Sequence, residues 1–230
     1  MDAILTQKSH PTISAIDPVA EVNHRIANSL ALLVGMVRMQ ARSVRKSPRP
    51  LAPAEANLML DGIAARIGAI GQLHRILSHA APDGVIGLKP YLKDVTDTLV
   101  AALSSPAQPV KVLHSGAECM VLIRHVQPIV LILCEIFLNA MKYAHPTGVP
   151  LIMSVDCAPA TDGTLVIICS DDGVGLPEGF DVQKAGGMGF RVMRGLASEM
   201  GADFIIESSS LGLTFRLSLP AGAMAGTKLS

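Results

Sequence analysis

The chain has 230 residues, of which half are apolar and only 3% aromatic. This length fits one large domain or two small ones with aliphatic cores. The formal net charge is zero, which gives no electrostatic footprint for nucleic acid or for an anionic membrane surface. The four cysteines form no CxxC pair, and the longest apolar stretch, 129–138, is too short to cross a bilayer. We therefore expect a soluble cytoplasmic protein with reduced core thiols.

Residues 1–17 lack periodicity and predict a loose N-terminal arm. Asp17 followed by Pro18 is typical of a helix start, and a proline-rich break at 47–50 separates this helix from a second one. Both helices carry an apolar seam at helical spacing, with His74 on the second seam. The predicted seam residues are Ile26, Leu30, Leu33 and Val37, then Ile63, Ile67, Ile70 and Leu77. Residues 18–80 thus predict a helical hairpin, and two hairpins from a homodimer would pair into a four-helix bundle.

A mixed segment follows the linker at 81–84 and extends over 83–222, before a C-terminal tail at 223–230. Apolar spacing predicts helices over 88–103, 125–144 and 189–200. Alternation predicts strands over 110–113, 151–156, 164–170, 203–207 and 214–219. We expect a sheet covered by helices on one side, so the fold class of the chain is α+β, a hairpin followed by an α/β sandwich.

Three polar residues share the face of the first helix that lies opposite its seam: Glu21, His24 and Asn28. A neutral imidazole is a competent nucleophile near neutral pH. Glu21 is placed to hold one ring nitrogen, although an acid in the first turns of a helix is also ordinary. Asn28 is placed either to orient a water or simply to face solvent. An isolated ExxHxxxN pattern is more often an ordinary surface, so its interpretation depends on the motifs downstream.

A second polar trio lies inside an apolar helix, where Glu135, Asn139 and Lys142 follow one another at spacings of four and three. Buried charge without a partner is costly, and a magnesium triphosphate would supply partners. Asn139 would be an oxygen ligand of Mg²⁺, and Lys142 would contact phosphate. Glu135 would order a metal-bound water or accept a proton.

Two glycine motifs complete the pattern, and each is weak on its own. Asp171 follows a strand and can accept the amino hydrogen of an adenine, while Gly173 and Gly175 let the backbone lie against the base. Gly187 and Gly189 precede a helix, whose first N–H groups suit phosphate. Residues 176–185 between the motifs predict a short lid over a nucleotide.

The N box at 135–144, DDGVG at 171–175 and GGMGF at 186–190 resemble, in order and spacing, the ATP-binding domain of the GHKL group. The HRxxN helix that precedes them is similar to the HWE-related branch of bacterial sensor histidine kinases. The resemblance covers about residues 20–220 and implies a Bergerat-type fold with ATP and Mg²⁺ as cofactors. It also implies autophosphorylation of His24 within a homodimer and transfer to an aspartate of a response regulator receiver domain.

The chain departs from this family pattern at several points. It has no Trp, and Ala27 and Ser29 replace the residues more typical beside the histidine. We expect no sensor domain before Asp17, so a signal would arrive through a separate sensor protein, through the short arm, or not at all. His74 is expected in the core or at a dimer interface, and the remaining histidines show no metal-ligand spacing.

The sequence is also compatible with two functions other than a histidine kinase. One is a dimeric phosphotransfer adaptor that uses His24 while its ATP-like domain serves only for docking; the intact Glu135, Asn139 and Asp171 argue against it. The other is an anti-sigma serine kinase of the same nucleotide-binding group, in which the histidine-bearing hairpin has no evident role.

Overall fold

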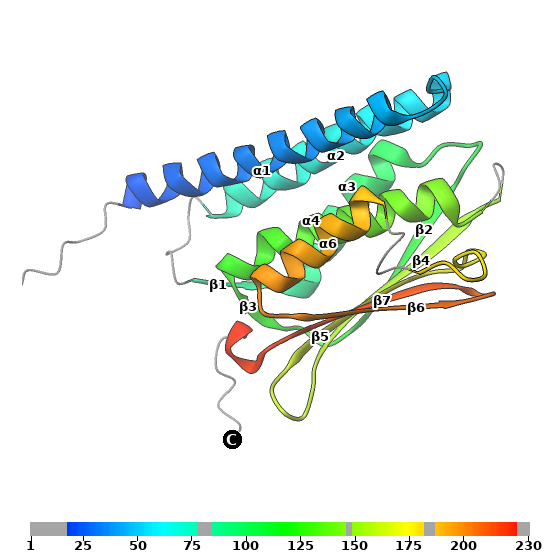
Figure 1. Cartoon of the computed structure of the whole chain (residues 1–230). Helices are drawn as coiled ribbons and strands as arrows, with labels where there is room; N and C mark the ends of the chain where they lie inside the picture. The colour runs from blue at the N-terminus through cyan, green and yellow to red at the C-terminus, as the bar shows by residue number, and fades with distance from the viewer. Residues whose placement is uncertain (1–17, 78–83, 146–148, 182–186, 225–230) are drawn as a thin grey trace, which may run out of the picture.

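The computed structural model describes residues 18–77, 84–145, 149–181 and 187–224, without the side chains of 18–25, 76, 77 and 188. Two long helices form a hairpin, and the remaining helices and strands form a layered unit beneath it (Figure 1). In chain order the elements are α1 (Pro18–Lys46), α2 (Pro53–Leu77), β1 (Val85–Gly87), α3 (Leu88–Leu103), β2 (Val110–Gly116), β3 (Met120–Leu122), α4 (Ile123–Tyr143), β4 (Leu151–Pro159), β5 (Leu165–Asp171), α6 (Met188–Glu199), β6 (Asp203–Ser209), β7 (Gly212–Leu219) and a 3₁₀ turn, η1 (Ala221–Ala223).

The hairpin begins at Pro18, where the sequence predicts a helix start, and its turn lies in the proline-rich break. Glu55 fixes the start of α2, because its carboxylate accepts the backbone N–H of Ala52 at 2.8 Å and pairs with Arg49 at 2.7 Å. An acid three residues into a helix that bonds back to the first N–H group is half of a capping box. The reversal of the chain is therefore defined by local chemistry.

The predicted seams of the hairpin are wrong in part. Leu30 is 55% exposed and Val37 38% exposed on α1, and Ile67 is 52% exposed on α2, whereas Leu33 and Ile70 are buried. Besides Leu33 and Ile70, the described side chains and glycines that α1 and α2 bury are Ser29, Met36, Gly62, Ala65, Arg66, Ala69 and Leu73. The hairpin has two apolar faces, and within one chain the layered unit covers only one of them. His74 is half-buried and lies within hydrogen-bond reach of Ser29 at 3.0 Å, which agrees with its predicted place in the core.

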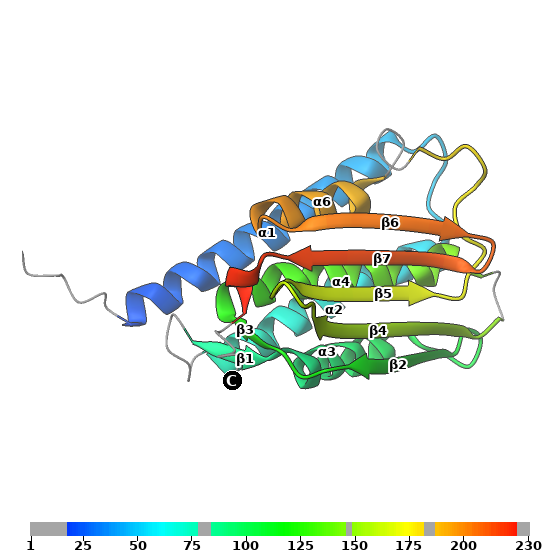
Figure 2. The ribbon, with the colours of Figure 1, turned by 90° about the horizontal axis from the view of Figure 1, so that it is seen from below.

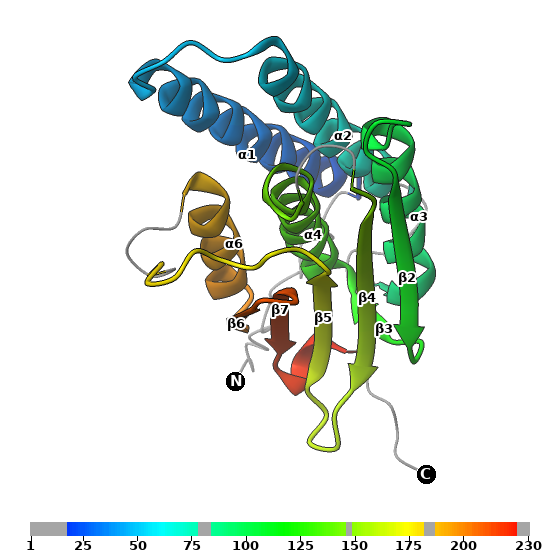
Figure 3. The same ribbon diagram turned by 90° about the vertical axis from the view of Figure 1, so that its right-hand side faces the viewer.

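The main sheet has the strand order β2-β4-β5-β7-β6, with β2 and β4 parallel and the other neighbours antiparallel (Figure 2). Helices α3, α4 and α6 cover one face of it, and the hairpin packs on the far side of those helices (Figure 3). This confirms the expected sheet with helices on one side. A second, two-stranded sheet of β1 and β3 was not predicted, since three residues are too few to show a period.

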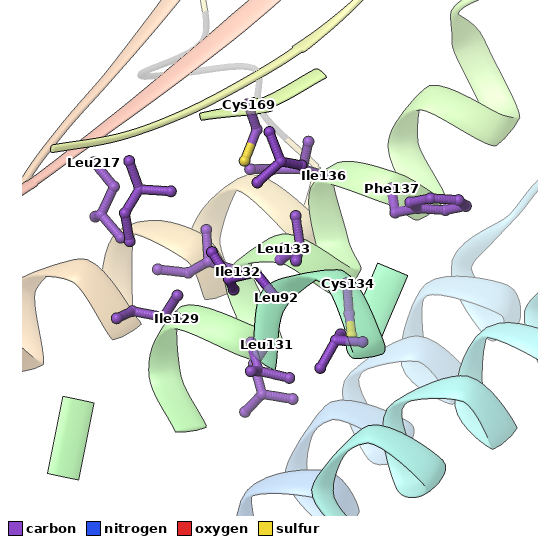
Figure 4. Close-up of a cluster of buried hydrophobic side chains, with 14 of the residues drawn as sticks. Leu92, Ile129, Leu131, Ile132, Leu133, Cys134, Ile136, Phe137, Cys169 and Leu217 are labelled. Atoms are coloured by element: carbon purple, nitrogen blue, oxygen red, sulfur yellow. The ribbon is translucent and has the colours of Figure 1, made fainter. Parts of the chain in front are cut away.

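Helix α4 is the centre of the core. Its side chains Ile129, Ile132, Leu133 and Ile136 pack toward Leu92, Cys169 and Leu217 from α3, β5 and β7 (Figure 4). All four cysteines are buried and free, as the sequence predicts. In length and composition α4 would suit a membrane span, but 78% of the relevant window is buried inside the protein. It is therefore a core helix.

Candidate functional site

The polar face of α4 presents Glu135, Asn139 and Lys142 toward the interior of the layered unit and its rim. Glu135 is only 6% exposed, Asn139 is half-buried and Lys142 is exposed. The trio therefore runs from the core toward solvent along one helix face. Partial burial and the nearby Arg66 lower the pKa of Lys142, while the carboxylates of Glu135 and Glu55 partly offset this. Lys142 thus lies at the mouth of the site.

The partner of Glu135 comes from the hairpin, which corrects the expectation that a ligand alone would neutralise this acid. Nε and Nη2 of Arg66 on α2 lie 2.8 Å and 2.5 Å from Glu135 Oε1. Nη1 of Arg66 donates to the carbonyl of Gly62, one turn earlier, at 3.0 Å. Both charged side chains are more than nine-tenths buried. Nothing in the local sequence singles out Arg66, because its pairing links residues 69 positions apart.

Asn139 lies beneath the first turn of α6. A Cβ added to Gly189 would lie 3.1 Å from Glu135 Oε2 and 3.3 Å from Asn139 Nδ2. Asn139 Nδ2 is buried and has no hydrogen-bond partner among the described residues. A buried amide without a partner costs free energy, so its presence points to a group that the polypeptide itself does not supply. The structure brings Glu135, Asn139 and Gly189 together, as the motifs predict.

Asp171 ends β5 and is nearly buried. Its Oδ1 accepts the backbone N–H groups of Gly173 at 3.0 Å and Leu213 at 3.3 Å. Both bonds end on Oδ1, so Oδ2 remains for another donor. Burial raises the pKa of Asp171, and the two backbone bonds partly offset that rise. A carboxylate held this way suits a neutral donor such as an aromatic amino group.

The glycines after Asp171 allow close approaches that a side chain would block. A Cβ on Gly173 would lie 2.5 Å from Cα of Ala144 at the end of α4. The next residue along, Val174, donates its N–H to the carbonyl of Ala144 at 2.9 Å. Gly175 has φ +72° and faces the carbonyl of Ser209. The DxGxG segment is thus joined to the C-terminal end of α4, which places Asp171 and Asn139 on two walls of one region.

The remaining glycine motif is described only in part. Gly187 is exposed and is the N-cap of α6, while Gly186 lies outside the described residues. Of the predicted lid, 176–181 is an irregular loop and 182–185 also lies outside the described residues. Leu176 is tethered by a backbone N–H bond to Ser208 Oγ at 2.8 Å. The first part of the loop is therefore anchored on β6.

A second contact at this site was missed by sequence reasoning. His145, just past α4, lies 2.8 Å from Asp172 Oδ1, which also accepts the backbone N–H of Ile152 at 3.0 Å. The pair ties the end of α4 to the second aspartate of DDGVG. The two adjacent aspartates of DDGVG were the feature of the sequence that could have indicated this contact. Among the described residues, no group of three or more His, Cys, Asp or Glu side chains is placed to hold a metal.

The phosphoacceptor candidates lie far from this region in the arrangement observed. Positions 21 and 24 are in the first turns of α1, and Asn28 is exposed. Ser29 Oγ donates to Gln127 Oε1 at 2.8 Å, so α1 passes the start of α4 there. Arg66 meets Glu135 and His74 meets Ser29, which means that α2 runs antiparallel to α4 and α1 runs parallel to it.

The separation along the helix axes follows from these contacts. Asn139 is twelve residues beyond Gln127, or roughly 18 Å at 1.5 Å per residue. Position 24 is five residues before Ser29, about 7.5 Å in the opposite direction. The backbone at position 24 therefore lies on the order of 25 Å along the axis from Asn139. The structure brings Glu135, Asn139, Asp171, Gly173 and Gly189 into one region and leaves Glu21, His24 and Asn28 outside it.

One helix carries an acid, an amide and a lysine, an aspartate is followed by two glycines, and a second glycine turn precedes α6. Together with the mixed sheet, these features define a GHKL-type ATP-binding domain. It is joined to a helical hairpin. Two family models match the chain: one described as "Histidine kinase" over residues 21–103, and one described as "Histidine kinase-, DNA gyrase B-, and HSP90-like ATPase" over residues 125–223. The chain therefore carries a histidine kinase phosphoacceptor module, followed by an ATPase module of the type found in histidine kinases.

Curated relatives agree with this assignment. The chain is 24% identical over 206 residues to "Blue-light-activated histidine kinase 2" of Erythrobacter litoralis, covering 88% of this chain and 56% of that protein. It is 23% identical over 195 residues to "Sensor histidine kinase PdtaS" of Mycobacterium tuberculosis, covering 84% of this chain and 36% of that protein. The chain thus spans about half or less of the length of these relatives.

Solved structures share the fold. The histidine kinase domain of the blue-light-activated histidine kinase from Erythrobacter litoralis superposes with a TM-score of 0.67 at 23% identity, covering 89% of this chain and 91% of that one. This likeness confirms the predicted Bergerat-type arrangement, an α+β fold with a hairpin followed by a GHKL domain.

Proposed function

We propose that this chain is an ATP-dependent protein-histidine kinase that autophosphorylates His24 and passes the phosphoryl group to an aspartate of a response regulator. The observation that carries the proposal is Asn139, whose buried Nδ2, between Glu135 and the backbone of Gly189, has no hydrogen-bond partner in the described part of the chain. It lies in a GHKL domain joined to a histidine-bearing hairpin. That domain type binds ATP, and the residues present fit the nucleotide.

Five residues would hold the nucleotide. Asp171 Oδ2 would accept the adenine amino hydrogen, and the flat backbone at Gly173 and Gly175 would lie against the base. The N–H groups at Gly187 and Gly189 would face phosphate at the start of α6. Mg²⁺ with ATP supplies a γ-phosphoryl group whose charge is partly neutralised.

Three further side chains would serve the transfer. The Asn139 amide oxygen would be a ligand of Mg²⁺, and Lys142 would contact phosphate from the rim. Glu135 would accept a proton or order a metal-bound water. These roles explain why α4 carries polar groups inside an apolar sequence.

On α1, His24 would attack phosphorus with the lone pair of one ring nitrogen. The new N–P bond forms as the bond to the bridging oxygen breaks, and the electron pair leaves on that oxygen. Glu21 would hold the N–H of the other ring nitrogen, and Asn28 would orient a water for hydrolysis of a phosphorylated partner. The hairpin 18–80 would be the phosphotransfer unit and 83–222 the ATP-binding unit.

A homodimer would cover the open face of the hairpin. Five large apolar side chains are exposed on that face, and they follow helical spacing along each helix: Leu30, Val34, Val37, Leu60 and Ile67. Aligned apolar residues that one chain leaves in water favour pairing with a second copy. Burying this stripe against its twofold mate would complete a four-helix bundle.

We further propose a cytoplasmic protein whose partners are a receiver domain and a separate sensor protein. The neutral net charge supports no role for nucleic acid or for a membrane surface. The buried position of α4 supports the same conclusion for the membrane.

Incubation of the purified chain with γ-labelled ATP tests the function. We expect an acid-labile, alkali-stable label that needs Mg²⁺ and that His24→Ala abolishes. His125→Gln, which removes a histidine at the start of α4, should retain the label. Chasing with a panel of receiver domains should move the label to an aspartate.

The competing function is the phosphotransfer adaptor. It predicts no label from ATP and no binding of a fluorescent ATP analogue, yet acceptance of phosphate on His24 from a phosphorylated receiver. That combination of results would overturn the kinase. The partnerless Asn139 amide favours the kinase, because a docking surface has no need for a buried, unsatisfied group.

A further inference from the structure

The contact between the hairpin and the ATP-binding domain is centred on one charged pair. Arg66 on α2 directs two nitrogens to a single oxygen of Glu135 on α4, at 2.8 Å and 2.5 Å. Beside the pair, Gly62 lets α2 approach closely, since a Cβ there would lie 2.9 Å from Leu138. The guanidinium is therefore enclosed by protein, and Glu135 is the carboxylate that it pairs with. Arg66 and Glu135 belong to different modules, so the pair exists only while the modules are docked.

The docked arrangement is incompatible with transfer to His24. Reacting atoms must come within about 3–3.5 Å. The backbone at position 24 is instead on the order of 25 Å along the axis from Asn139. A twofold axis parallel to the hairpin keeps every residue at the same height, so the partner copy of His24 is equally distant along that axis. The ATP-binding domain must move relative to α2 before either histidine can be reached.

The consequence for Glu135 follows directly. Its Oε1 is occupied by Arg66 and its Oε2 faces the backbone of Gly189. The carboxylate that the kinase needs as a proton acceptor is thus held by the kinase's own hairpin. Movement of the domain separates α2 from α4 and releases Oε1 for the reaction.

We propose that Arg66 is a positioning residue that latches the kinase in a resting state, by binding Glu135 across the interface between the hairpin and the ATP-binding domain. This inference rests on the proposed function. It adds a control point that lies outside the nucleotide contacts and outside the phosphoacceptor turn. A signal that shifts α2 along α4 would act by breaking this pair.

Arg66→Met, which keeps the length of the side chain and removes its charge, tests the latch in the full chain. We expect kcat for autophosphorylation to rise about three- to tenfold while KM for ATP changes less than twofold, because the nucleotide contacts are intact. Arg66→Lys should give a smaller rise, since one ammonium replaces two nitrogens of a fork. Arg45→Met, on an exposed part of α1, is the matched control and should leave both constants unchanged. A fall in kcat would overturn the latch and make Arg66 a support for catalysis.

A reversible lock tests the same idea without touching the pair. Ser29→Cys with Gln127→Cys places one thiol on each of the two helices whose side chains now meet at 2.8 Å, so that a short, reducible bis-methanethiosulfonate reagent can join them; the native cysteines are all buried. Cross-linking should hold the modules docked, suppress labelling at least tenfold and leave binding of a fluorescent ATP analogue intact. Reduction should restore labelling.

The two proposals fail in different ways. Full labelling in the cross-linked double variant would show that docking does not restrain the kinase, and the latch would be wrong while the kinase stands. Loss of nucleotide binding and of labelling in the unmodified chain would instead remove the proposed function.

Discussion

The hairpin and the ATP-binding domain are built from similar amphipathic helices, but they differ in how much of their apolar surface is buried within the chain. In the ATP-binding domain, the apolar face of α4 is buried from Ile129 to Met141 by strands and helices of the same chain. On α1, Leu33 and Met36 are buried while Leu30 and Val34 remain in water. Helix α4 is enclosed by the sheet on one side and the hairpin on the other, whereas the hairpin has two apolar faces and only one of them is covered within the chain.

The comparison extends to charge. Both modules carry acids among apolar residues, yet exposed Glu55 is satisfied by a residue six positions away and buried Glu135 by one 69 positions away. Short-range partners can be found by reading along the chain, while long-range ones depend on how the modules dock. Four experiments would break or sharpen this contrast.

The largest effect is expected from two leucines on α2. Leu73 is fully buried, so Leu73→Ala should lower the free energy of unfolding by about 2–5 kcal/mol. Leu60 is 58% exposed in the single chain, so Leu60→Ala should leave the unfolding of the monomer nearly unchanged and weaken self-association. Urea denaturation and sedimentation measure the two quantities. Equal losses of stability would show that the two faces of the hairpin are not distinct.

Asn139 separates function from stability in the ATP-binding domain. Asn139→Ala should lower the rate of autophosphorylation at least about 100-fold, which is roughly 2.7 kcal/mol of transition-state stabilisation. The free energy of unfolding should not fall, because Nδ2 has no partner to lose among the described residues. Labelling rates and urea midpoints provide the test. A large loss of stability would mean that the amide supports the fold.

Two glycines should respond to alanine in opposite directions. Gly173→Ala sets a Cβ against the backbone of Ala144 and should cost about 1–3 kcal/mol of unfolding free energy. Gly195, on α6, has open space around it, and Gly195→Ala should add about 0.5–1 kcal/mol. Thermal melts of the two variants measure both signs. A stable Gly173→Ala protein would argue that α4 and the DxGxG segment are not tightly joined.

The smallest effect concerns Asp171. Burial raises the pKa of Asp171 in the folded chain, so the folded state holds its proton more tightly than the unfolded state does. The contribution of this group to stability therefore falls as pH rises from the usual aspartate range to the raised pKa, and stays unfavourable above it. Asp171→Asn should raise stability slightly at neutral pH, remove that part of the pH dependence and weaken nucleotide binding about tenfold or more. Thermal melts between pH 4 and pH 8 and titration with nucleotide measure these effects. A variant that is less stable than the unmodified chain and binds nucleotide normally would contradict the prediction.

The sequence by itself determined most of the elements and their order. Apolar spacing predicted α3 over its whole length, and Asp171 was recognised at a strand end. These features are local, because capping, turn chemistry and periodicity act within a few residues. The motif order was enough to indicate a GHKL domain behind a phosphoacceptor helix.

Only the tertiary structure decided which residues became partners. The pairing of Arg66 with Glu135, the contact between His145 and Asp172 and the choice of buried face on the hairpin join segments that are distant in sequence. Periodicity gives the angle of a side chain around its own helix and says nothing about which module packs there. The residues of an interface between modules depend on how the modules dock, so only the three-dimensional arrangement of the helices identifies them.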